Sequence, residues 1–379
     1  MWTSQRDDLV GRAGLSSSKG QPRRRQFHPL SVRSVQPLCD DAVAISFEIP
    51  PALVETFAFV PGQSVTLRRT IDGREERRSY SICAPVGDLV RVGIREVPGG
   101  VFSSWLVHQV HPGEVLEVQA PAGSFTPDLA AGGRHVLIAA GSGITPVLSI
   151  AASLLIDSDA QVTLFYGNRR TTSVMFAEEL SDLKDRFGPR LELVHVLSRE
   201  PRDVELFTGR LDAERVRLLL HLLVPVGDVD HFWLCGPLGM VDDAIRVLRE
   251  LGVPEGRMHR ELFYVEDVAP ETRTNGPESD RDPNAGEPTS AVTIILDGRS
   301  TTLPLRRDVP VLDSAQVSRS DLPFACKGGV CGTCRARVTS GTVDMRRNYA
   351  LEVSEVEAGF VLTCQSLPTS DEVTVDYDA

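Results

Sequence analysis

The chain has 379 residues, which is enough for two or three domains. Its formal net charge of -12 argues against a nucleic-acid-binding protein, because phosphate recognition needs a basic face, and the one basic run, residues 23–25, is read as a solvated patch. The sequence shows neither a signal peptide nor an apolar run of membrane-spanning length. We therefore expect a soluble, cytoplasmic protein that binds neither nucleic acid nor membranes.

The N-terminal part of the chain changes character at residue 27. Residues 1–26 lack hydrophobic periodicity and are rich in serine, glycine and arginine, so we expect a disordered tail. Short alternating stretches follow, at residues 30–35, 42–47 and 64–68, each bounded by proline, glycine or aspartate. Strands this short and regularly spaced predict a small antiparallel β-barrel over residues 27–127.

A four-residue stretch after a polar loop, Arg78-Ser79-Tyr80-Ser81, resembles the R-x-Y-S stretch in the flavin domain of the ferredoxin-NADP reductase superfamily. The resemblance implies that Arg78 pairs with the FAD pyrophosphate, Tyr80 lies against the flavin ring and Ser81 points toward the reactive flavin nitrogen. Each residue type suits its role, since a guanidinium binds phosphate, an aromatic face covers a flat ring and a hydroxyl bonds a nitrogen. A strand with a chance tyrosine is the alternative.

A second stretch supports the flavin site. Residues 92–97 are a predicted strand, and a glycine loop leads from it into an amphipathic helix, whose N-terminus offers free N–H groups to a phosphate. The run Gly100-Val101-Phe102-Ser103 matches the G-x-x-S portion of the same family. These four residues are therefore predicted to bind FAD.

The hydrophobic pattern changes after residue 127. Residues 134–140 form a continuous apolar run, as expected of a strand buried on both faces of a parallel sheet. A glycine turn and an apolar helical stretch over residues 147–156 follow, which is the phosphate-binding unit of dinucleotide domains, although the turn ends in proline. The resemblance assigns four residues of the turn to the nicotinamide end of the nucleotide, with the threonine near the flavin: Gly141, Gly143, Thr145 and Pro146.

Three more strands continue the rhythm of strand and helix, at residues 161–166, 191–197 and 231–234. The loops after them leave the carboxyl ends of the strands, where an open parallel sheet binds its ligand. We therefore expect an α/β nucleotide domain over residues 128–266. Its loops supply further predicted ligands of the nucleotide: Arg169, Ser198, Arg199, Cys235, Gly236 and Pro237.

Ser198 and Arg199 bear on the choice of nucleotide. An arginine with a hydroxyl neighbour suits the 2′-phosphate of NADPH, whereas NAD sites favour a carboxylate on the ribose. We expect NADPH, and Glu200, directly after the pair, keeps NADH possible.

The resemblance also places residues at the reacting centre. In the family, a C-G-P loop sets its thiol beside the nicotinamide ring, which gives this role to Cys235; without the surrounding pattern, Cys235 is read as a small buried residue. Ser81, Thr145 and Cys235 are accordingly the candidate catalytic residues. Glu261 and Phe263, in a last predicted strand, occupy the place where family members put residues near the flavin.

The last part of the chain begins after a break in the pattern. Residues 267–290 are polar, contain proline and lack periodicity, so we expect a linker that lets the last domain move. Within residues 291–379, a hairpin around Asp297-Gly298, a short helix over residues 311–317 and a closing strand over residues 373–376 are predicted.

Four of the seven cysteines form a motif. Cys326, Cys331 and Cys334 have the spacing C-x4-C-x2-C, and Cys364 follows after a long gap. This is the plant-type ferredoxin arrangement, in which four thiolates hold a 2Fe-2S cluster. The alternatives are a zinc site and a pair of disulfides; zinc ribbons usually repeat C-x2-C pairs, and disulfide frameworks are typical of small secreted chains.

The loop that carries the cluster cysteines needs backbone conformations that most residues avoid. Glycines that reach positive φ let backbone N–H groups approach the sulfurs, and Gly328, Gly329 and Gly332 are placed for this. The other three cysteines are scattered, and free thiols beside an iron-sulfur cluster fit the reducing cytoplasm.

These parts predict a multidomain chain with an antiparallel β-barrel FAD domain, an α/β parallel-sheet NADP domain and an α+β ferredoxin domain of the β-grasp type. Over residues 27–379 the chain resembles oxygenase reductases that fuse a ferredoxin-NADP reductase module to a C-terminal plant-type ferredoxin. Within that class it is most similar to the reductases of phenylacetyl-CoA epoxidases. The resemblance is carried by residues 321–334, 348–352, 363–365 and 373–378.

The resemblance implies that electrons pass from NADPH through FAD and the cluster to an oxygenase on a separate polypeptide, which in the epoxidase family is a di-iron enzyme. The chain itself lacks the repeated Glu-x-x-His motif of di-iron proteins and has no haem motif. Three alternatives stay open: the reductase of a ketosteroid 9α-hydroxylase with a Rieske partner, a redox sensor with a vestigial reductase half, and a diaphorase without a protein partner. Gly329-Val330 and the Ser198-Arg199 pair favour the epoxidase interpretation.

Overall fold

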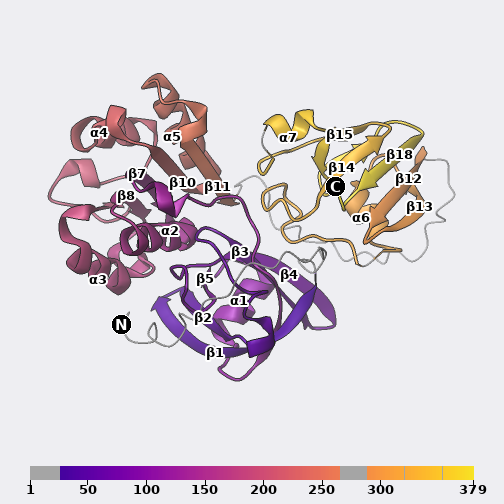
Figure 1. The fold of residues 1–379 in the computed structure, drawn as a ribbon, viewed down its shortest axis with the longest axis horizontal. Helices are drawn as coiled ribbons and strands as arrows, with labels where there is room; N and C mark the ends of the chain where they lie inside the picture. Colours follow the sequence, from indigo (N-terminus) through magenta and orange to yellow (C-terminus); the bar gives the residue numbers. More distant parts are fainter. Residues whose placement is uncertain (1–25, 265–287, 320, 352) are drawn as a thin grey trace.

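The computed structural model describes residues 26–264, 288–319, 321–351 and 353–379. These residues form three large sheets and one small one, each of the large sheets with its own helices (Figure 1). The arginine run and nearly all of the predicted tail and linker lie outside the described residues. None of the helices in the described part of the chain is long and apolar enough to cross a membrane.

The N-terminal sheet is antiparallel, as predicted, with the strand order β4-β3-β6-β1-β2-β5. Alternate residues of its strands, such as Leu30, Val32, Ile45 and Phe47, are buried in one apolar core, because every second side chain of a strand points to the same face. Its elements are β1 (Phe27–Cys39), β2 (Ala42–Glu48), β3 (Ser64–Ile71), β4 (Arg74–Ser81), β5 (Arg91–Arg95), α1 (Val101–His108) and β6 (Val115–Gln119). We call this part the barrel.

The middle sheet is parallel throughout, which confirms the predicted α/β class. Its strand order is β11-β10-β7-β8-β9. Its elements are β7 (Arg134–Ala140), α2 (Ile144–Asp157), β8 (Gln161–Asn168), α3 (Ala177–Phe187), β9 (Leu191–Leu197), α4 (Ala213–Leu223), β10 (His231–Pro237), α5 (Leu238–Glu250) and β11 (Met258–Tyr264). Helices α4 and α5 were not predicted from the sequence.

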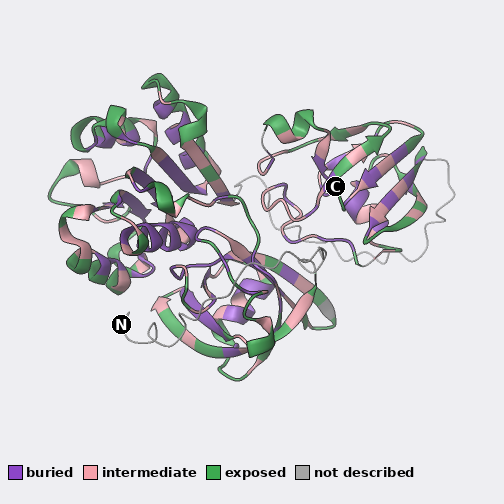
Figure 2. Ribbon diagram, viewed as in Figure 1, coloured by how far each residue is buried: buried purple, intermediate pink, exposed green. Residues whose placement is uncertain are grey.

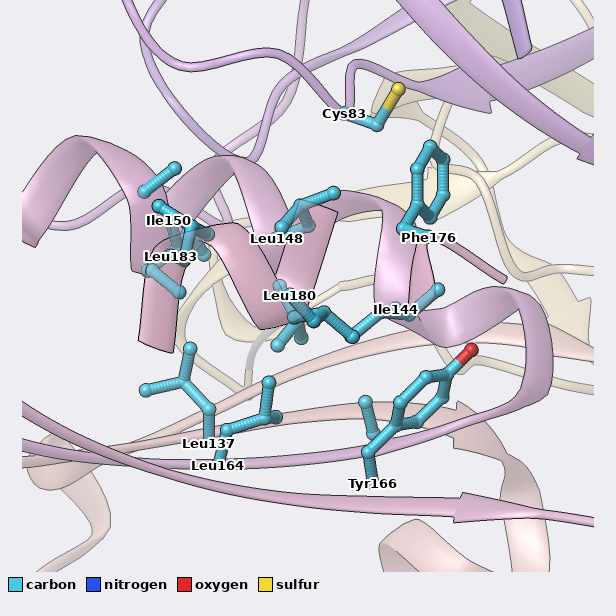
Figure 3. Packing of buried hydrophobic residues seen from close by; sticks show 14 of the residues in the cluster. Cys83, Leu137, Ile144, Leu148, Ile150, Leu164, Tyr166, Phe176, Leu180 and Leu183 are labelled. Carbon is cyan, nitrogen blue, oxygen red and sulfur yellow. The ribbon is translucent and has the colours of Figure 1, made fainter. Parts of the chain in front are cut away.

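Helices cover both faces of the parallel sheet. Leu137 and Leu164 pack with α2 and α3 on one face, whereas Val136 and Ile138 pack with α4 and α5 on the other. Figure 3 shows the first face, and Figure 2 shows that α2 is buried along most of its length. This explains why β7 and α2 both read as nearly continuous apolar runs.

The barrel and the parallel sheet share one apolar core, because Cys83 from the barrel belongs to the same cluster as α2 and α3 (Figure 3). At this seam β5 carries Gly93, where an ideal Cβ would lie 2.6 Å from the Thr145 methyl and 2.8 Å from the Phe176 ring. Beside it, Arg91 donates two hydrogen bonds to Glu179 of α3, at 2.9 and 2.8 Å. A side chain at residue 93 would therefore push the two domains apart.

The C-terminal sheet has the order β13-β12-β18-β14-β16, with β12 and β18 parallel, and a two-stranded sheet beside it. Asp297 and Gly298 both have positive φ, as the predicted tight hairpin requires. The helix predicted over residues 311–317 ends two residues earlier. The elements are β12 (Thr289–Leu296), β13 (Arg299–Arg306), α6 (Val311–Ala315), β14 (Arg335–Ser340), β15 (Val343–Met345), α7 (Val353–Glu357), β16 (Phe360–Leu362), β17 (Ser366–Pro368) and β18 (Glu372–Asp376).

The Arg91–Glu179 pair is expected to stabilise the seam between the barrel and the parallel sheet. Each side chain is only 14% exposed, so replacing Glu179 by alanine leaves a cation with little access to water. We expect Glu179→Ala to lower the free energy of unfolding by about 2 kcal/mol, measured by denaturant titration. The exposed pair of Arg217 and Glu250 is the control, and Glu250→Ala should lower the free energy of unfolding much less than Glu179→Ala does. Equal losses in both variants would show that the buried pair does not hold the seam.

Candidate functional site

The two stretches predicted to bind FAD lie together on the barrel. The Tyr80 ring of β4 packs edge-on against the Phe102 ring of α1, with centroids 6.4 Å apart. Burial raises the pKa of the Tyr80 hydroxyl, so this phenol stays protonated. Arg78 extends to the surface, where its guanidinium lies 3.4 Å from the Glu76 carboxylate. An aromatic face and an accessible cation on one strand fit a flat ring system with a phosphate tail.

Two of the residues predicted to bind FAD make hydrogen bonds within the barrel domain in this structure. Ser79 shares a hydrogen bond with Thr66 of β3, at 3.1 Å. Ser103 accepts a hydrogen bond from the Val97 N–H at 3.0 Å and donates to the Gly100 carbonyl at 3.3 Å, which closes the turn before α1. A Cβ at Gly100 would lie 2.7 Å from the Ser103 hydroxyl. This turn leaves the N-terminus of α1, beginning with the exposed Val101, open to an anion.

The glycine turn after β7 packs directly against the C-G-P loop after β10. A Cβ at Gly143 would lie 2.2 Å from the carbonyl oxygen of Cys235, so this close approach requires glycine. Thr145 and Pro146 are buried in the first turn of α2, and Thr145 donates a hydrogen bond to the Ser142 carbonyl at 3.0 Å. Gly141 has a φ of +57°, which favours glycine. The structure thus brings together two loops predicted to bind the nicotinamide end.

A carboxyl group connects the two predicted reacting centres. Cys235 lies between Ala139 and Glu261 on neighbouring parallel strands. Ser81 of the barrel donates a hydrogen bond to Glu261, with 3.2 Å between the hydroxyl and carboxylate oxygens. Ser81, Glu261 and Cys235 therefore lie in one row across the junction of the two domains, and Thr145 is buried at the nearby seam.

Burial sets the protonation state of this row. Burial raises the pKa of Glu261 to about 8, and the hydrogen bond from Ser81 acts against this rise. Burial and the Glu261 charge raise the pKa of the Cys235 thiol well above its ordinary value. At neutral pH the row therefore holds a proton on Glu261 beside Ser81, and Cys235 is a neutral thiol.

Arginines gather at the carboxyl ends of β8 and β9. The side chains of Arg169 and Arg199 are exposed there, and the Arg199 N–H donates to the Arg169 carbonyl at 2.8 Å. Ser198 bonds the Asn168 carbonyl at 3.3 Å. Arg170 and Arg202, which the sequence analysis did not select, lie close enough to lower the pKa of Glu200. The run of two arginines directly after a predicted strand was the available signal for Arg170.

Glu200 makes its hydrogen bonds with Thr171, beside Arg170 and Arg202. It accepts hydrogen bonds from the hydroxyl and the backbone N–H of Thr171, at 2.7 and 2.8 Å. These hydrogen bonds are the main reason that the pKa of Glu200 is below its ordinary value. A carboxylate fixed in this way leaves Arg199 available to a phosphate.

The four cluster cysteines lie in the C-terminal domain as two pairs. The thiols of Cys326 and Cys331 lie close enough to shift each other's pKa, and so do those of Cys334 and Cys364. Nowhere in the described part of the chain do three His, Cys, Asp or Glu side chains converge on one single-ion site. Two thiols for each of two iron atoms is the donor set that a 2Fe-2S cluster requires.

The backbone of the cluster loop differs from the prediction at one residue. Gly329 and Gly332 have positive φ, at +79° and +67°, but Gly328 does not. The neighbouring Lys327 adopts this conformation instead, with a φ of +53°. Gly328 contributes its N–H, which donates to the Cys326 sulfur at 3.3 Å.

Hydrogen bonds to sulfur prepare the loop for metal. The Cys331 N–H also donates to Cys326, at 3.4 Å. The Cys331 thiol and these backbone N–H groups lower the pKa of Cys326 to about 6. A thiolate is the form that binds iron, so these hydrogen bonds favour the form of Cys326 that a cluster ligand needs.

Three family models match the chain in the order of its sheets. They are the oxidoreductase FAD-binding domain over residues 29–126, the oxidoreductase NAD-binding domain over residues 137–246 and the 2Fe-2S iron-sulfur cluster binding domain over residues 294–369. These matches support FAD, a nicotinamide nucleotide and a 2Fe-2S cluster as cofactors, while the roles of the individual residues stay predictions.

Several known proteins are similar to this chain over most of its length. The chain is 41% identical to one of the subunits of 1,2-phenylacetyl-CoA epoxidase from Escherichia coli K12, over 93% of this chain and 98% of that protein. It is 33% identical to the 3-ketosteroid-9-alpha-monooxygenase ferredoxin reductase component of Rhodococcus rhodochrous, over 92% and 96% of the two chains. The fold is that of phthalate dioxygenase reductase, with a TM-score of 0.57 and 21% identity over 92% of this chain and 98% of that one.

The raised pKa of Glu261 predicts a pH-dependent stability. Below about pH 4.5 the carboxyl is protonated in the folded and the unfolded chain, and its stabilising contribution is complete. This contribution is lost as the pH rises toward the folded-state pKa of about 8, because the unfolded chain releases its proton first. We expect the free energy of unfolding of the FAD-loaded protein to fall over this range relative to Glu261→Gln.

Denaturant titrations of both proteins at a series of pH values measure this difference. The exposed Glu214 of α4 is the control, and Glu214→Gln should follow the wild-type curve. Parallel curves for the wild type and Glu261→Gln would contradict the assignment of the proton to Glu261.

Proposed function

The chain belongs to the family of oxygenase reductase components that join FAD-binding, NAD-binding and 2Fe-2S domains, and on this basis we propose that its partner is the di-iron oxygenase of a phenylacetyl-CoA epoxidase. The protein is an NAD(P)H-dependent oxidoreductase that passes electrons to a separate oxygenase component. The 41% identity to a protein of the Escherichia coli epoxidase, over nearly the full length of both chains, supports this choice of partner.

The row of Ser81, Glu261 and Cys235 is the observation that carries the reductase function. When bound, FAD accepts a hydride from the nicotinamide and the cluster accepts single electrons. We assign Arg78 and the N-terminus of α1 to the FAD phosphates, and Tyr80 to the flavin ring. Ser81 then presents its hydroxyl to the flavin, and the proton held on Glu261 lies one hydrogen bond behind it.

The nucleotide is assigned to the carboxyl edge of the parallel sheet. The turn at Gly141–Gly143 packs directly against the Cys235 loop, and we assign the nicotinamide end to the surface that these two loops form together. Arg199, with Ser198 beside it, is assigned to the 2′-phosphate, and we propose NADPH as the preferred donor. The hydrogen bonds that hold Glu200 on Thr171 support this preference.

We place the protein in the cytoplasm. All seven cysteines are free thiols, and four of them have the arrangement of an iron-sulfur site. Both features suit a reducing compartment.

Reconstitution with candidate oxygenases tests the proposed partner. With NADPH, the purified chain is expected to support oxidation of phenylacetyl-CoA by the epoxidase oxygenase, measured as substrate consumed per NADPH. With the terminal oxygenase of a 3-ketosteroid-9-alpha-monooxygenase we expect little turnover. Comparable turnover with the steroid oxygenase would contradict the choice of partner.

A substitution of one cluster cysteine distinguishes electron transfer through the cluster from reduction of the FAD. Cys331→Ser is expected to lose the visible absorption of the cluster and all oxygenase-coupled turnover, because one iron loses a thiolate. Reduction of ferricyanide by NADPH, which needs only the FAD and nucleotide sites, should stay near the wild-type rate. An equal loss of ferricyanide reduction would mean that the two modules do not act separately.

The assignment of Arg199 predicts a change in nucleotide preference. Arg199→Glu is expected to raise the KM for NADPH by about tenfold or more, because a charge-assisted hydrogen bond to phosphate is replaced by repulsion. The KM for NADH should change much less. Arg217→Glu, on the exposed side of α4, is the control and should change neither value. Equal effects of Arg199→Glu on both nucleotides would show that Arg199 does not contact the 2′-phosphate.

A further inference from the structure

We propose that Arg77 is a positioning residue that docks the C-terminal domain on the barrel, so that the cluster loop is held against the strand assigned to FAD. Arg77 lies in β4, directly before Arg78 and four residues before Ser81. Its guanidinium lies 4.8 Å from the centre of the Phe324 ring, which belongs to the C-terminal domain. In the sequence, the whole parallel-sheet domain lies between the two segments that this contact joins, as the colours of Figure 1 show.

The burial of Arg77 is unusual for its strand. Arg77 is only 6% exposed, whereas the side chain of Arg78 is 49% exposed. A buried cation is costly unless charged or aromatic groups surround it. Glu75 accepts a hydrogen bond from the Arg77 Nε, and the Phe27 ring lies 5.4 Å away on the barrel. Phe324 is the member of this surrounding set that the C-terminal domain supplies.

Phe324 is closely tied to the cluster ligands. It lies two residues before Cys326, and its ring also contacts the Lys327 ammonium at 4.9 Å. Lys327 in turn bonds Asp313 of α6, and its carbonyl accepts a hydrogen bond from the Gln365 side chain, next to Cys364. Any force on the Phe324 ring therefore acts on the loop that holds the cluster.

A second contact fixes the orientation of the same loop. Val330, which lies just before Cys331, packs against the apolar core of the parallel sheet, and so does Tyr349. The Tyr349 N–H donates to the Gly329 carbonyl at 3.1 Å, so these two contacts belong to one surface. The loop thus touches the barrel near its first cysteine and the parallel sheet near its second. Two separated contacts determine how the C-terminal domain is turned, and Arg77 provides the one next to the flavin strand.

Hydrogen exchange of the holoenzyme, followed by mass spectrometry, tests the docking contact. Arg77→Met should raise amide exchange in residues 322–330 by about tenfold or more, and Phe324→Leu should do the same in residues 75–79. Phe324→Leu keeps an apolar side chain in the C-terminal core, so it tests the contact even if Arg77→Met binds FAD poorly. Arg68→Met is the control, because Arg68 stacks on Phe27 from the same barrel without sharing the Phe324 contact.

A spectroscopic measurement shows whether the contact positions the cluster. After mixing with NADPH, bleaching of the cluster band should slow by about tenfold in Phe324→Leu, while bleaching of the flavin band is unchanged. Phe324→Tyr keeps the aromatic face and should restore the wild-type rate. Unchanged exchange in both partner segments, an equal effect of Arg68→Met, equal slowing of the two bands, or failure of Phe324→Tyr to restore the rate would each overturn the proposal.

Discussion

The barrel and the parallel sheet meet where Gly93 leaves room for Thr145 and Phe176, and the relation between the two nucleotide-binding halves depends on this contact. The apolar core that runs from Cys83 into α2 and α3 makes the junction continuous, and the Arg91–Glu179 pair closes its edge. Because this seam fixes the two domains, Ser81 on the barrel can reach Glu261 on the sheet. A reductase that transfers a hydride between two bound ligands needs this fixed relation, since small displacements of reacting groups lower the rate strongly.

The C-terminal domain depends on a looser kind of contact. Its four thiols form two pairs within their own fold, so all four predicted cluster ligands come from this one domain. Its relation to the barrel and the sheet is set by a few side chains, chiefly Arg77, Phe324, Val330 and Tyr349. This arrangement suits an electron carrier. The cluster must lie close to the flavin that donates electrons to it, whereas the acceptor of those electrons is a separate protein.

The sequence predicted the features that arise from local patterns. Period-two alternation identified the barrel strands, the rhythm of strand and helix identified the parallel sheet, and Asp297-Gly298 identified a hairpin. The cysteine spacing predicted a 2Fe-2S domain, which the family model over residues 294–369 supports, and the structure places its four thiols as two neighbouring pairs. What failed was local backbone detail, since positive φ lies at Lys327 rather than Gly328. Specific contacts between distant segments were not predicted: the resemblance placed Ser81 and Glu261 near the flavin but not their hydrogen bond across 180 residues, and the burial of Arg77 depends on a ring from another domain.

We propose that this one chain carries electrons from NADPH through FAD to its own cluster. Anaerobic stopped-flow mixing of the wild-type protein with NADPH, recorded across the flavin and iron-sulfur bands, tests this electron path. We expect both bands to bleach, the cluster band after the flavin band, and more slowly with NADH as the donor. Bleaching of the flavin band with an unchanged cluster band would mean that the two modules are not coupled within one chain.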